Sequence, residues 1–118
     1  MLHTKIVDLT KEKIIISNAE KFITSSKFGA SIYFVGTVRD LNNDKKVNGI
    51  TYDSHDELVI KSFKEIYQES QGKFKFENSA VFIEHVKGHV KLGEISIIIA
   101  VACKHRSQSY DLSRFIIE

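Results

Sequence analysis

The sequence predicts an α+β fold in which a largely antiparallel sheet with hairpins is packed against helices. Three observations support this class. Segments with the β-branched and aromatic content of strands outnumber segments with helical spacing. Several predicted strands follow one another with only short turns between them, which favours hairpins. The run at residues 94–104 is apolar on both faces, which is typical of a central strand covered on both sides.

In the first half of the chain, Ser17 and Glu20 have the spacing of a capping box, so a helix is expected to follow them. The polar stretch RDLNNDKK at residues 39–46 predicts a turn or loop. Alternation and β-branched content mark the strands. The strands predicted in this half lie at residues 4–9, 30–38 and 47–54.

In the second half, Ser54 and Glu57 repeat the capping-box spacing and predict a helix that runs to about Gln71–Gly72. A short turn is expected at Lys87–Gly88, and Ser107 is expected to cap a final helix. The predicted order is therefore β-α-β-β-α-β-β-β-α in one domain, residues 1–118. The strands predicted in this half lie at residues 76–85, 89–92 and 94–104.

Composition narrows the class of protein. Hydrophobic residues make up 42% and charged residues 27%, which is ordinary for a soluble globular chain and argues against disorder. The net charge of +2 is too small to predict binding to nucleic acid or to a membrane, but it permits a local basic pocket. One cysteine cannot form an internal disulfide. We expect a cytoplasmic protein without a metal or a cofactor.

His105 and Arg106 lie where the apolar strand meets the last helix. A helix N-terminus favours an anion, arginine offers a planar fork for phosphate or carboxylate, and histidine exchanges a proton near neutral pH. This pattern indicates an anion site. The alternative is a histidine that only caps the strand beside a solvated arginine.

Arg39 closes the segment YFVGTVR, in which Gly36 lets the backbone bend or approach a ligand closely. Arg39 then leaves the strand end with its charge free, although an exposed strand-end arginine is the commoner case. Phe34, which precedes the glycine, is expected in the core.

Two further patterns carry weaker hypotheses. Cys103 and His105 share a strand face and resemble a thiolate–imidazole pair, but a lone cysteine in an apolar strand is usually a small buried hydrophobe. His85 and His89 flank Gly88 with a spacing that some metal sites use. Two ordinary histidines of a hairpin are the better interpretation.

The final helix places Tyr110, Arg114 and Ile117 on one stripe beside its core-facing stripe. The chain ends at Glu118 without a C-cap signal. We therefore expect these 118 residues to be a shortened or partly ordered version of a longer protein.

Three elements in order resemble the large, catalytic subunit of molybdopterin synthase. They are F-x-G-x-V-R at Phe34 to Arg39, G-x-x-x-x-G-E at Gly88 to Glu94, and H-R-S-x-S-aromatic at His105 to Tyr110. Each element is modest alone. Their order and separation make chance similarity improbable, and the resemblance extends over nearly the whole chain from Gly29.

The resemblance implies an α/β-hammerhead-like subunit that forms a homodimer and acts in molybdenum cofactor biosynthesis. One small ubiquitin-like sulfur-carrier subunit would dock on each copy, giving a heterotetramer. The carrier's C-terminal Gly-Gly thiocarboxylate would deliver sulfur to cyclic pyranopterin monophosphate, and two transfers would give the dithiolene of molybdopterin. The resemblance assigns substrate binding to Thr37, Val38, Arg39, His105 and Arg106, and the pocket wall to Phe34 and Ile117.

The chain departs from the family's pattern at three points. The family continues past the last helix with a lysine one turn beyond the Ile117 position and a second lysine in a tail, and both are held to be essential. The family's catalytic lysines therefore fall beyond Glu118. His85-Val86 stands where the family usually has His-Arg, and SHDEL at residues 54–58 replaces an aromatic-containing segment.

Two alternatives stay open at this point. One is a noncatalytic relative that still binds the pterin or the small partner but lacks the lysines. The other is an RNA-binding module, because SIYFVGTV resembles the RNP2 strand of an RRM with Tyr33 as the stacking aromatic. The segment at residues 72–82 matches RNP1 poorly, and a further helix follows the last strand.

Overall fold

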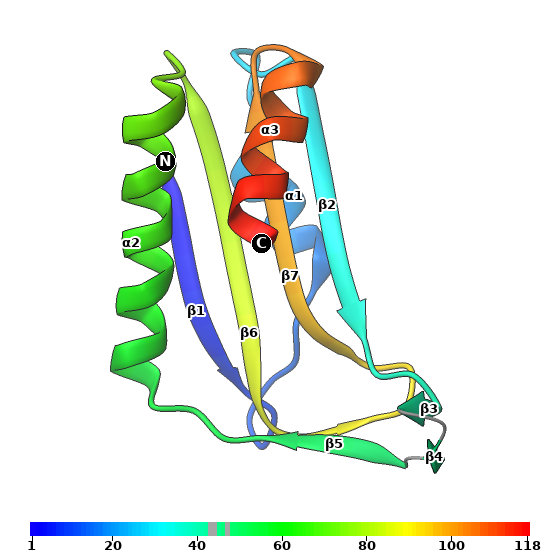
Figure 1. Ribbon diagram of the computed structural model, residues 1–118. Helices are drawn as coiled ribbons and strands as arrows, with labels where there is room; N and C mark the ends of the chain where they lie inside the picture. Colours follow the sequence, from blue (N-terminus) through cyan, green and yellow to red (C-terminus); the bar gives the residue numbers. More distant parts are fainter. Residues whose placement is uncertain (43–44, 47) are drawn as a thin grey trace.

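The computed structural model of the chain describes residues 1–42, 45–46 and 48–118. It contains a mixed sheet with the strand order β1-β6-β7-β2, and β5 pairs with the distal part of β6 (Figure 1). The β1–β6 pair is parallel and the other pairs are antiparallel, so the predicted α+β class is confirmed. The strands are β1 (Leu2–Asp8), β2 (Ala30–Thr37), β3 (Leu41–Asn42), β4 (Lys45–Lys46), β5 (Gly49–Tyr52), β6 (Ser79–Lys91) and β7 (Ile95–Cys103), and the helices are α1 (Ile16–Ile23), α2 (Asp56–Phe74) and α3 (Arg106–Ile117).

The predicted central strand is β7, which lies between β6 and β2. Helix α1 covers one face of the sheet, and α2 and α3 cover the other (Figure 1). Side chains of β7 alternate between these layers: Ile98 joins a buried cluster with Ile23 of α1, and Ile99 joins one with Leu112 of α3. Burial of each such side chain contributes about 1.5–3 kcal/mol to the stability of the folded state. Among the described residues, no helix is long and apolar enough to span a membrane.

The two predicted capping boxes are wrong. Helix α1 begins at Ile16 and α2 at Asp56, so Ser17 already lies inside α1 and Ser54 lies before the N-cap of α2. Neither helix has a side-chain hydrogen bond at its N-cap. In α2, Asp56 and Glu57 occupy the first turn, where their negative charges interact favourably with the helix dipole.

The expected end of the second helix and the expected turn at Lys87–Gly88 also differ from the structure. Helix α2 runs through Gly72 to Phe74, and Lys75 ends it in the left-handed conformation with φ 53°. No turn divides β6 at Gly88, which stays in the strand and pairs with Tyr52 of β5. Gly88 has φ 107°, a conformation that glycine adopts without strain, and a strand glycine of this kind resembles a turn glycine in the sequence.

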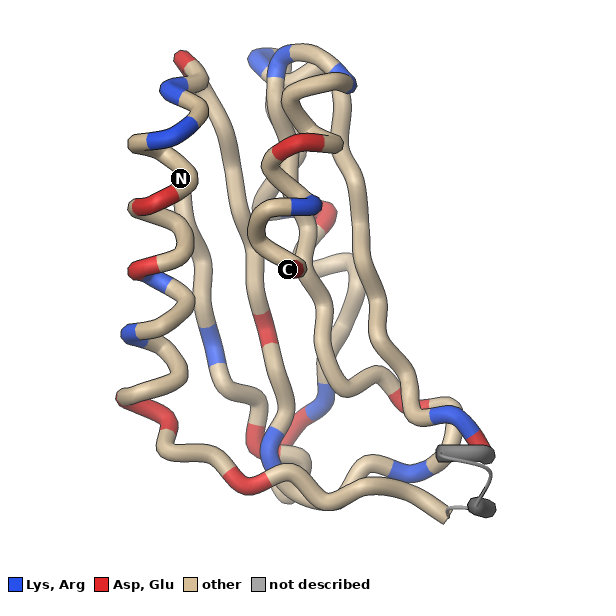
Figure 2. Tube along the Cα trace, viewed as in Figure 1, with Lys and Arg blue, Asp and Glu red and all other residues tan. Residues whose placement is uncertain are grey.

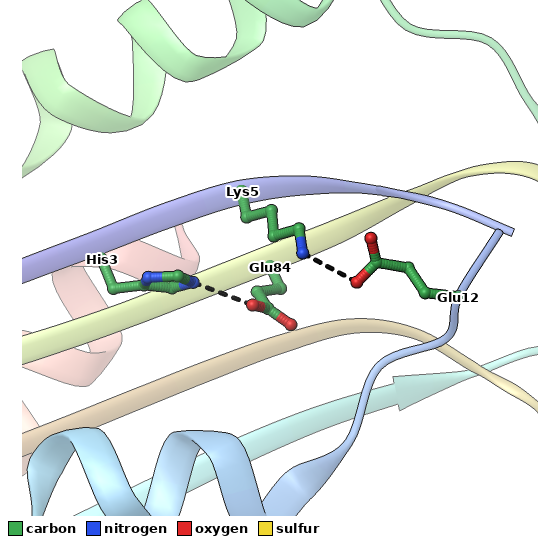
Figure 3. Close-up of polar contacts among 4 residues, drawn as sticks. All are labelled: His3, Lys5, Glu12 and Glu84. Atoms are coloured by element: carbon green, nitrogen blue, oxygen red, sulfur yellow. Dashed lines mark hydrogen bonds and ion pairs between the residues drawn. The ribbon is translucent and has the colours of Figure 1, made fainter.

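A polar group lies on the α1 face of the sheet at its β1 edge (Figure 3). The His3 ring stacks on Phe82 with 4.3 Å between ring centroids, and its Nε2 lies 2.8 Å from Oε2 of the buried Glu84. Nearby, Lys5 Nζ donates to Glu12 Oε1 at 2.7 Å. The hydrogen bond from His3 satisfies a carboxylate that would otherwise be buried without a partner.

Candidate functional site

Arg39 lies where β2 leaves the sheet beside the β6–β7 turn. The register shifts between Gly36 and Thr37, and a Cβ on Gly36 would lie 2.7 Å from Ile97 Cγ2. The glycine therefore permits the close approach that the sequence suggested. Beyond it, the Val38 N–H donates to Glu94 O at 3.4 Å and the Val38 carbonyl accepts from Gly93 N–H at 3.0 Å. These bonds hold the buried Val38 while Arg39 is exposed.

His105 and Arg106 lie at the start of α3, and both are exposed. The helix begins at Arg106 with His105 as its N-cap, so the cap predicted at Ser107 is wrong. Gln108 Oε1 accepts a hydrogen bond from the His105 N–H at 3.2 Å. Ser109 Oγ, fully buried, donates to the Ala30 carbonyl at 2.9 Å and ties α3 to β2.

Sequence reasoning missed the roles of Gln108 and Ser109. Gln108 occupies a position from which a side chain often bonds to the start of a helix, whereas the bond from Ser109 to β2 depends on tertiary packing. A glutamine at the third helical position is a recognised signal of a helix N-terminus, although Ser107 was the residue expected to cap the helix. These two side chains fix how His105 and Arg106 sit relative to β2.

Within one chain, the structure does not bring Arg39 together with His105 and Arg106. Strands β2 and β7 are antiparallel, with Ala30 opposite Cys103 and Thr37 opposite Ile95. The two cationic groups both follow the C-terminal ends of their strands, so they lie at opposite ends of the pair (Figure 1). The eight residues of β2 separate these ends by about 25 Å. Basic residues accordingly occur at both ends of this pair (Figure 2).

An apolar edge joins the two ends. Strand β2 pairs with β7 alone among the described residues, and Tyr33, Phe34 and Val35 are 37%, 41% and 37% exposed. Phe34 was expected in the core and instead is 41% exposed. It lies on the α3 face of the sheet, because it is two residues from Ile32, which packs on that face. Ile117 is also exposed on α3.

The α3 surface carries a hollow of about 250 Å³, whose lining includes Tyr110 and Ile117. Ser113, Arg114 and Glu118 complete the lining. The stripe predicted from the helical spacing of Tyr110, Arg114 and Ile117 is therefore present as one lined surface.

Cys103 is not placed as a nucleophile. Its side chain is fully buried in β7, and burial raises the pKa of the thiol, with a smaller opposing effect from the Ser109 hydroxyl. His105 lies past the strand end and is exposed. The interpretation of Cys103 as a small buried hydrophobe therefore fits the structure.

His85 and His89 make separate local contacts. His85 Nδ1 lies 2.9 Å from the Val86 carbonyl oxygen and its ring meets Tyr52 edge-on, whereas His89 Nδ1 lies 3.0 Å from Thr51 Oγ1. Over the described parts of the chain, no group of three or more His, Cys, Asp or Glu side chains is arranged to hold a metal ion.

Comparison with known proteins decides the family. The profile described as MoaE protein matches residues 9–118. The chain belongs to the MoaE family. This agrees with the resemblance of the three sequence elements, and it removes the RNA-binding module as an interpretation of the fold.

Two curated relatives of this MoaE chain are both named molybdopterin synthase catalytic subunit. The protein from Emericella nidulans is 33% identical over 112 residues, and the protein from Pyrococcus abyssi is 30% identical over 103 residues. These matches cover 95% and 87% of the chain. The chain spans 56% of the length of the Emericella protein and 68% of the Pyrococcus protein.

Solved structures show the same fold. Molybdopterin synthase from Staphylococcus aureus superposes with a TM-score of 0.84 at 25% identity, covering 95% of this chain and 78% of that one. A complex of subunits 1 and 2 of molybdopterin-converting factor from Helicobacter pylori gives a TM-score of 0.75 at 22% identity. That match covers 97% of this chain and 74% of the other. The fold implied by the resemblance is confirmed.

Proposed function

We propose that this chain is a cytoplasmic molybdopterin synthase catalytic subunit, acting in molybdenum cofactor biosynthesis by binding cyclic pyranopterin monophosphate. Its family and the names of its curated relatives support this. One observation from the structure supports the proposal most strongly. The outer edge of β2 is apolar, has no partner strand among the described residues, and is flanked at its two ends by cationic residues. A site that is split within one chain becomes whole if two copies meet along that edge.

The strand directions support a twofold arrangement of two copies. An antiparallel pairing of two β2 edges, centred near Phe34, brings the Arg39 end of one copy beside the Arg106 end of the second copy. It also covers Tyr33 and Val35, whose apolar surface is otherwise exposed to water. Each dimer then contains two equivalent sites. The implied homodimer thus supplies a cradle that the single chain lacks.

In this cradle, the guanidinium groups of Arg39 and Arg106 bind the substrate's phosphate through paired hydrogen bonds. His105 contributes a ring nitrogen to the pterin side, and the backbone of Thr37 and Val38 lines the floor of the site. The walls are assigned to Phe34 and Ile117. We assign binding and orientation to these residues, not bond-making.

The proposed partner is a small ubiquitin-like sulfur carrier with a C-terminal Gly-Gly thiocarboxylate. The Helicobacter complex of two subunits, in which the matching chain has this fold, supports a two-component assembly. One carrier per copy gives a heterotetramer on the dimer. Two sulfur atoms, delivered in turn from two thiocarboxylates, account for the two sulfurs of the dithiolene.

The first test is substrate affinity. Arg39→Ala and Arg106→Ala are each expected to weaken binding of the pterin monophosphate by about 1.5–3 kcal/mol, the range for hydrogen bonds to charged groups. Isothermal titration calorimetry measures this directly. Lys64→Ala, on the exposed surface of α2, is the control with the same loss of charge. Unchanged affinity in both arginine variants would remove them from the site.

The second test asks whether the site is shared between copies. Unfolding and refolding a mixture of Arg39→Ala and Arg106→Ala chains produces mixed dimers, each with one site that lacks both arginines and one that keeps both. About a quarter of all sites should regain wild-type affinity. If each site belonged to a single chain, the mixture would show no wild-type sites at all.

A further inference from the structure

A second cleft, lined by none of the residues assigned above, lies between two turns of the backbone. One wall is the connection from β1 to α1, and the other is the end of β6 with the turn that follows it. Its volume is about 400 Å³, which is within the range of small-ligand pockets. Its lining consists of Leu9, Thr10, Lys11, Glu12, Lys13, His89, Lys91 and Glu94.

The first wall is held in place by Asp8. Its Oδ1 accepts hydrogen bonds from the Thr10 N–H at 3.0 Å and the Thr10 hydroxyl at 2.8 Å. Its carbonyl oxygen accepts from the N–H groups of Lys11 and Glu12 at 2.9 and 3.0 Å. The Asp8 carboxylate is therefore used to shape the turn, and it does not line the cleft.

The second wall is held by the turn after β6. The Lys91 N–H donates to Glu94 Oε1 at 2.8 Å, and the Glu94 N–H donates back to the Lys91 carbonyl at 3.1 Å. Gly93, with φ 78°, donates to the Val38 carbonyl at 3.0 Å. Both walls are thus formed before any ligand arrives, which lowers the entropy cost of binding.

The acidic and basic side chains that line the cleft differ in whether they already have partners. Glu12 is bound to Lys5 at 2.7 Å, outside the lining (Figure 3), and Glu94 accepts the Lys91 N–H. In contrast, the ammonium groups of Lys11, Lys13 and Lys91 make no ion pair with any described residue, as the four ion pairs of the described chain lie elsewhere. The acids stabilise the walls while the cations are available to a ligand.

We propose that this cleft binds a small anion bearing a phosphate group. Three lysine ammonium groups on two preformed walls supply charge-assisted hydrogen bonds to phosphate oxygens. Neither Arg39 nor Arg106 lines the cleft, so its lining is distinct from the pterin cradle, which it adjoins at the hydrogen bonds between Val38 and the turn of Gly93 and Glu94. The inference does not depend on the proposed function.

The test uses inorganic pyrophosphate as the probe and the intact chain labelled with ¹⁵N. At low salt, titration should shift the backbone amide signals of residues 10–13 and 89–94. The double variant Lys13→Gln/Lys91→Gln should weaken binding at least about tenfold, the effect of losing one charged hydrogen bond. Both lysines are exposed, so the variant keeps its fold.

The matched control is Lys21→Gln/Lys64→Gln, which removes the same charge from exposed positions on α1 and α2. It should leave pyrophosphate affinity within about twofold of the wild type, because remote surface charges are screened. Equal weakening in both double variants would overturn the proposal. Signal shifts confined to the surroundings of Arg39 or Arg106 would also overturn it.

A third variant separates this proposal from the pterin site. Arg39→Ala should keep the pyrophosphate shifts at residues 10–13 and 89–94, even where it loses affinity for the pterin. Loss of those shifts in Arg39→Ala would show that the cleft and the cradle are one site, and would overturn the separate site proposed here.

Discussion

The two edge strands of the sheet, β1 and β2, differ in what they present to the surroundings. Strand β1 places His3 and Lys5 on the α1 face of its edge, where both engage carboxylates, and α2 packs over β1. Strand β2 exposes Tyr33, Phe34 and Val35 in succession. Charged side chains on an edge strand discourage pairing with another chain, whereas an exposed apolar edge favours it.

This difference indicates that the sheet has one closed edge and one open edge. Both strands pair on one side only among the described residues, so hydrogen-bonding potential alone does not distinguish them. The side chains do. The open edge is also the edge whose two ends carry the cations that we propose bind the substrate, so the proposed assembly and the proposed site share this edge.

The largest effect is expected when β2 receives a charged side chain of the kind that β1 carries on its edge. Val35→Lys places two like charges near the proposed twofold axis, and it should raise the dimer dissociation constant about 10- to 100-fold. Sedimentation at several protein concentrations measures this. Pterin affinity should fall in the same variant, because the shared cradle is lost with the dimer.

Leu58→Lys is the control for this experiment. Leu58 is 63% exposed on α2, away from the β2 edge, and its replacement should leave the dimer intact. A Val35→Lys protein that sediments like the wild type would place the subunit contact on another surface.

The next effect concerns the closed edge. His3→Ala leaves the buried carboxylate of Glu84 without its hydrogen-bond partner and removes the stacking on Phe82. The free energy of unfolding should fall by about 1–3 kcal/mol. Urea denaturation at neutral pH measures the change.

Lys5→Ala on the same strand provides a matched comparison, because it removes the more exposed pair with Glu12. That substitution should cost about 0–1 kcal/mol. If His3→Ala cost no more than Lys5→Ala, the hydrogen bond to Glu84 would not stabilise the edge.

The smallest effect is expected at the start of α2, the helix that covers β1. Lys87 Nζ donates to Asp56 Oδ2 at 2.9 Å and lowers the pKa of that carboxyl. A carboxyl whose pKa is lowered by folding stabilises the folded state when the pH is above the pKa of the unfolded chain, about 4. That contribution is lost as the pH falls through the folded pKa.

Asp56→Asn should therefore be slightly less stable than the wild type at pH 7 and should approach it as the pH falls to about 3. Urea midpoints across this range give the comparison. Asp53→Asn, at an exposed aspartate without an ion pair in the described chain, is the control. A constant difference between Asp56→Asn and the wild type at all pH values would contradict the linkage to Lys87.

Much of the fold was predictable because burial leaves a pattern. The apolar run of β7 identified the central strand, and helical spacing identified α3 with Leu112 on its buried face. The helix starts were not predictable in this way. A serine three residues before a glutamate is a common pattern, and at Ser17 and Ser54 it falls one residue inside α1 and one residue before the N-cap of α2.

The sequence marked the residues of the proposed site one by one, but it did not predict how they are arranged. The sequence elements marked Arg39 and Arg106, and each does follow a strand. Strand direction, however, depends on how β2 and β7 pair, and antiparallel neighbours send their C-terminal ends to opposite sides. The lysines of the second cleft gave no sequence signal, because Lys13 and Lys91 come together only through the turns after β1 and β6.

The buried position of Cys103 has a practical consequence. It is the only cysteine of the 118 residues, and its side chain is fully buried in the cluster between the sheet and α3. Alkylating reagents need a solvent-reachable thiolate, so the rate of modification reports how often the core opens. Mass spectrometry of the alkylated protein therefore measures the rate at which the core opens, in the wild type and in every variant that keeps the cysteine, without an added label.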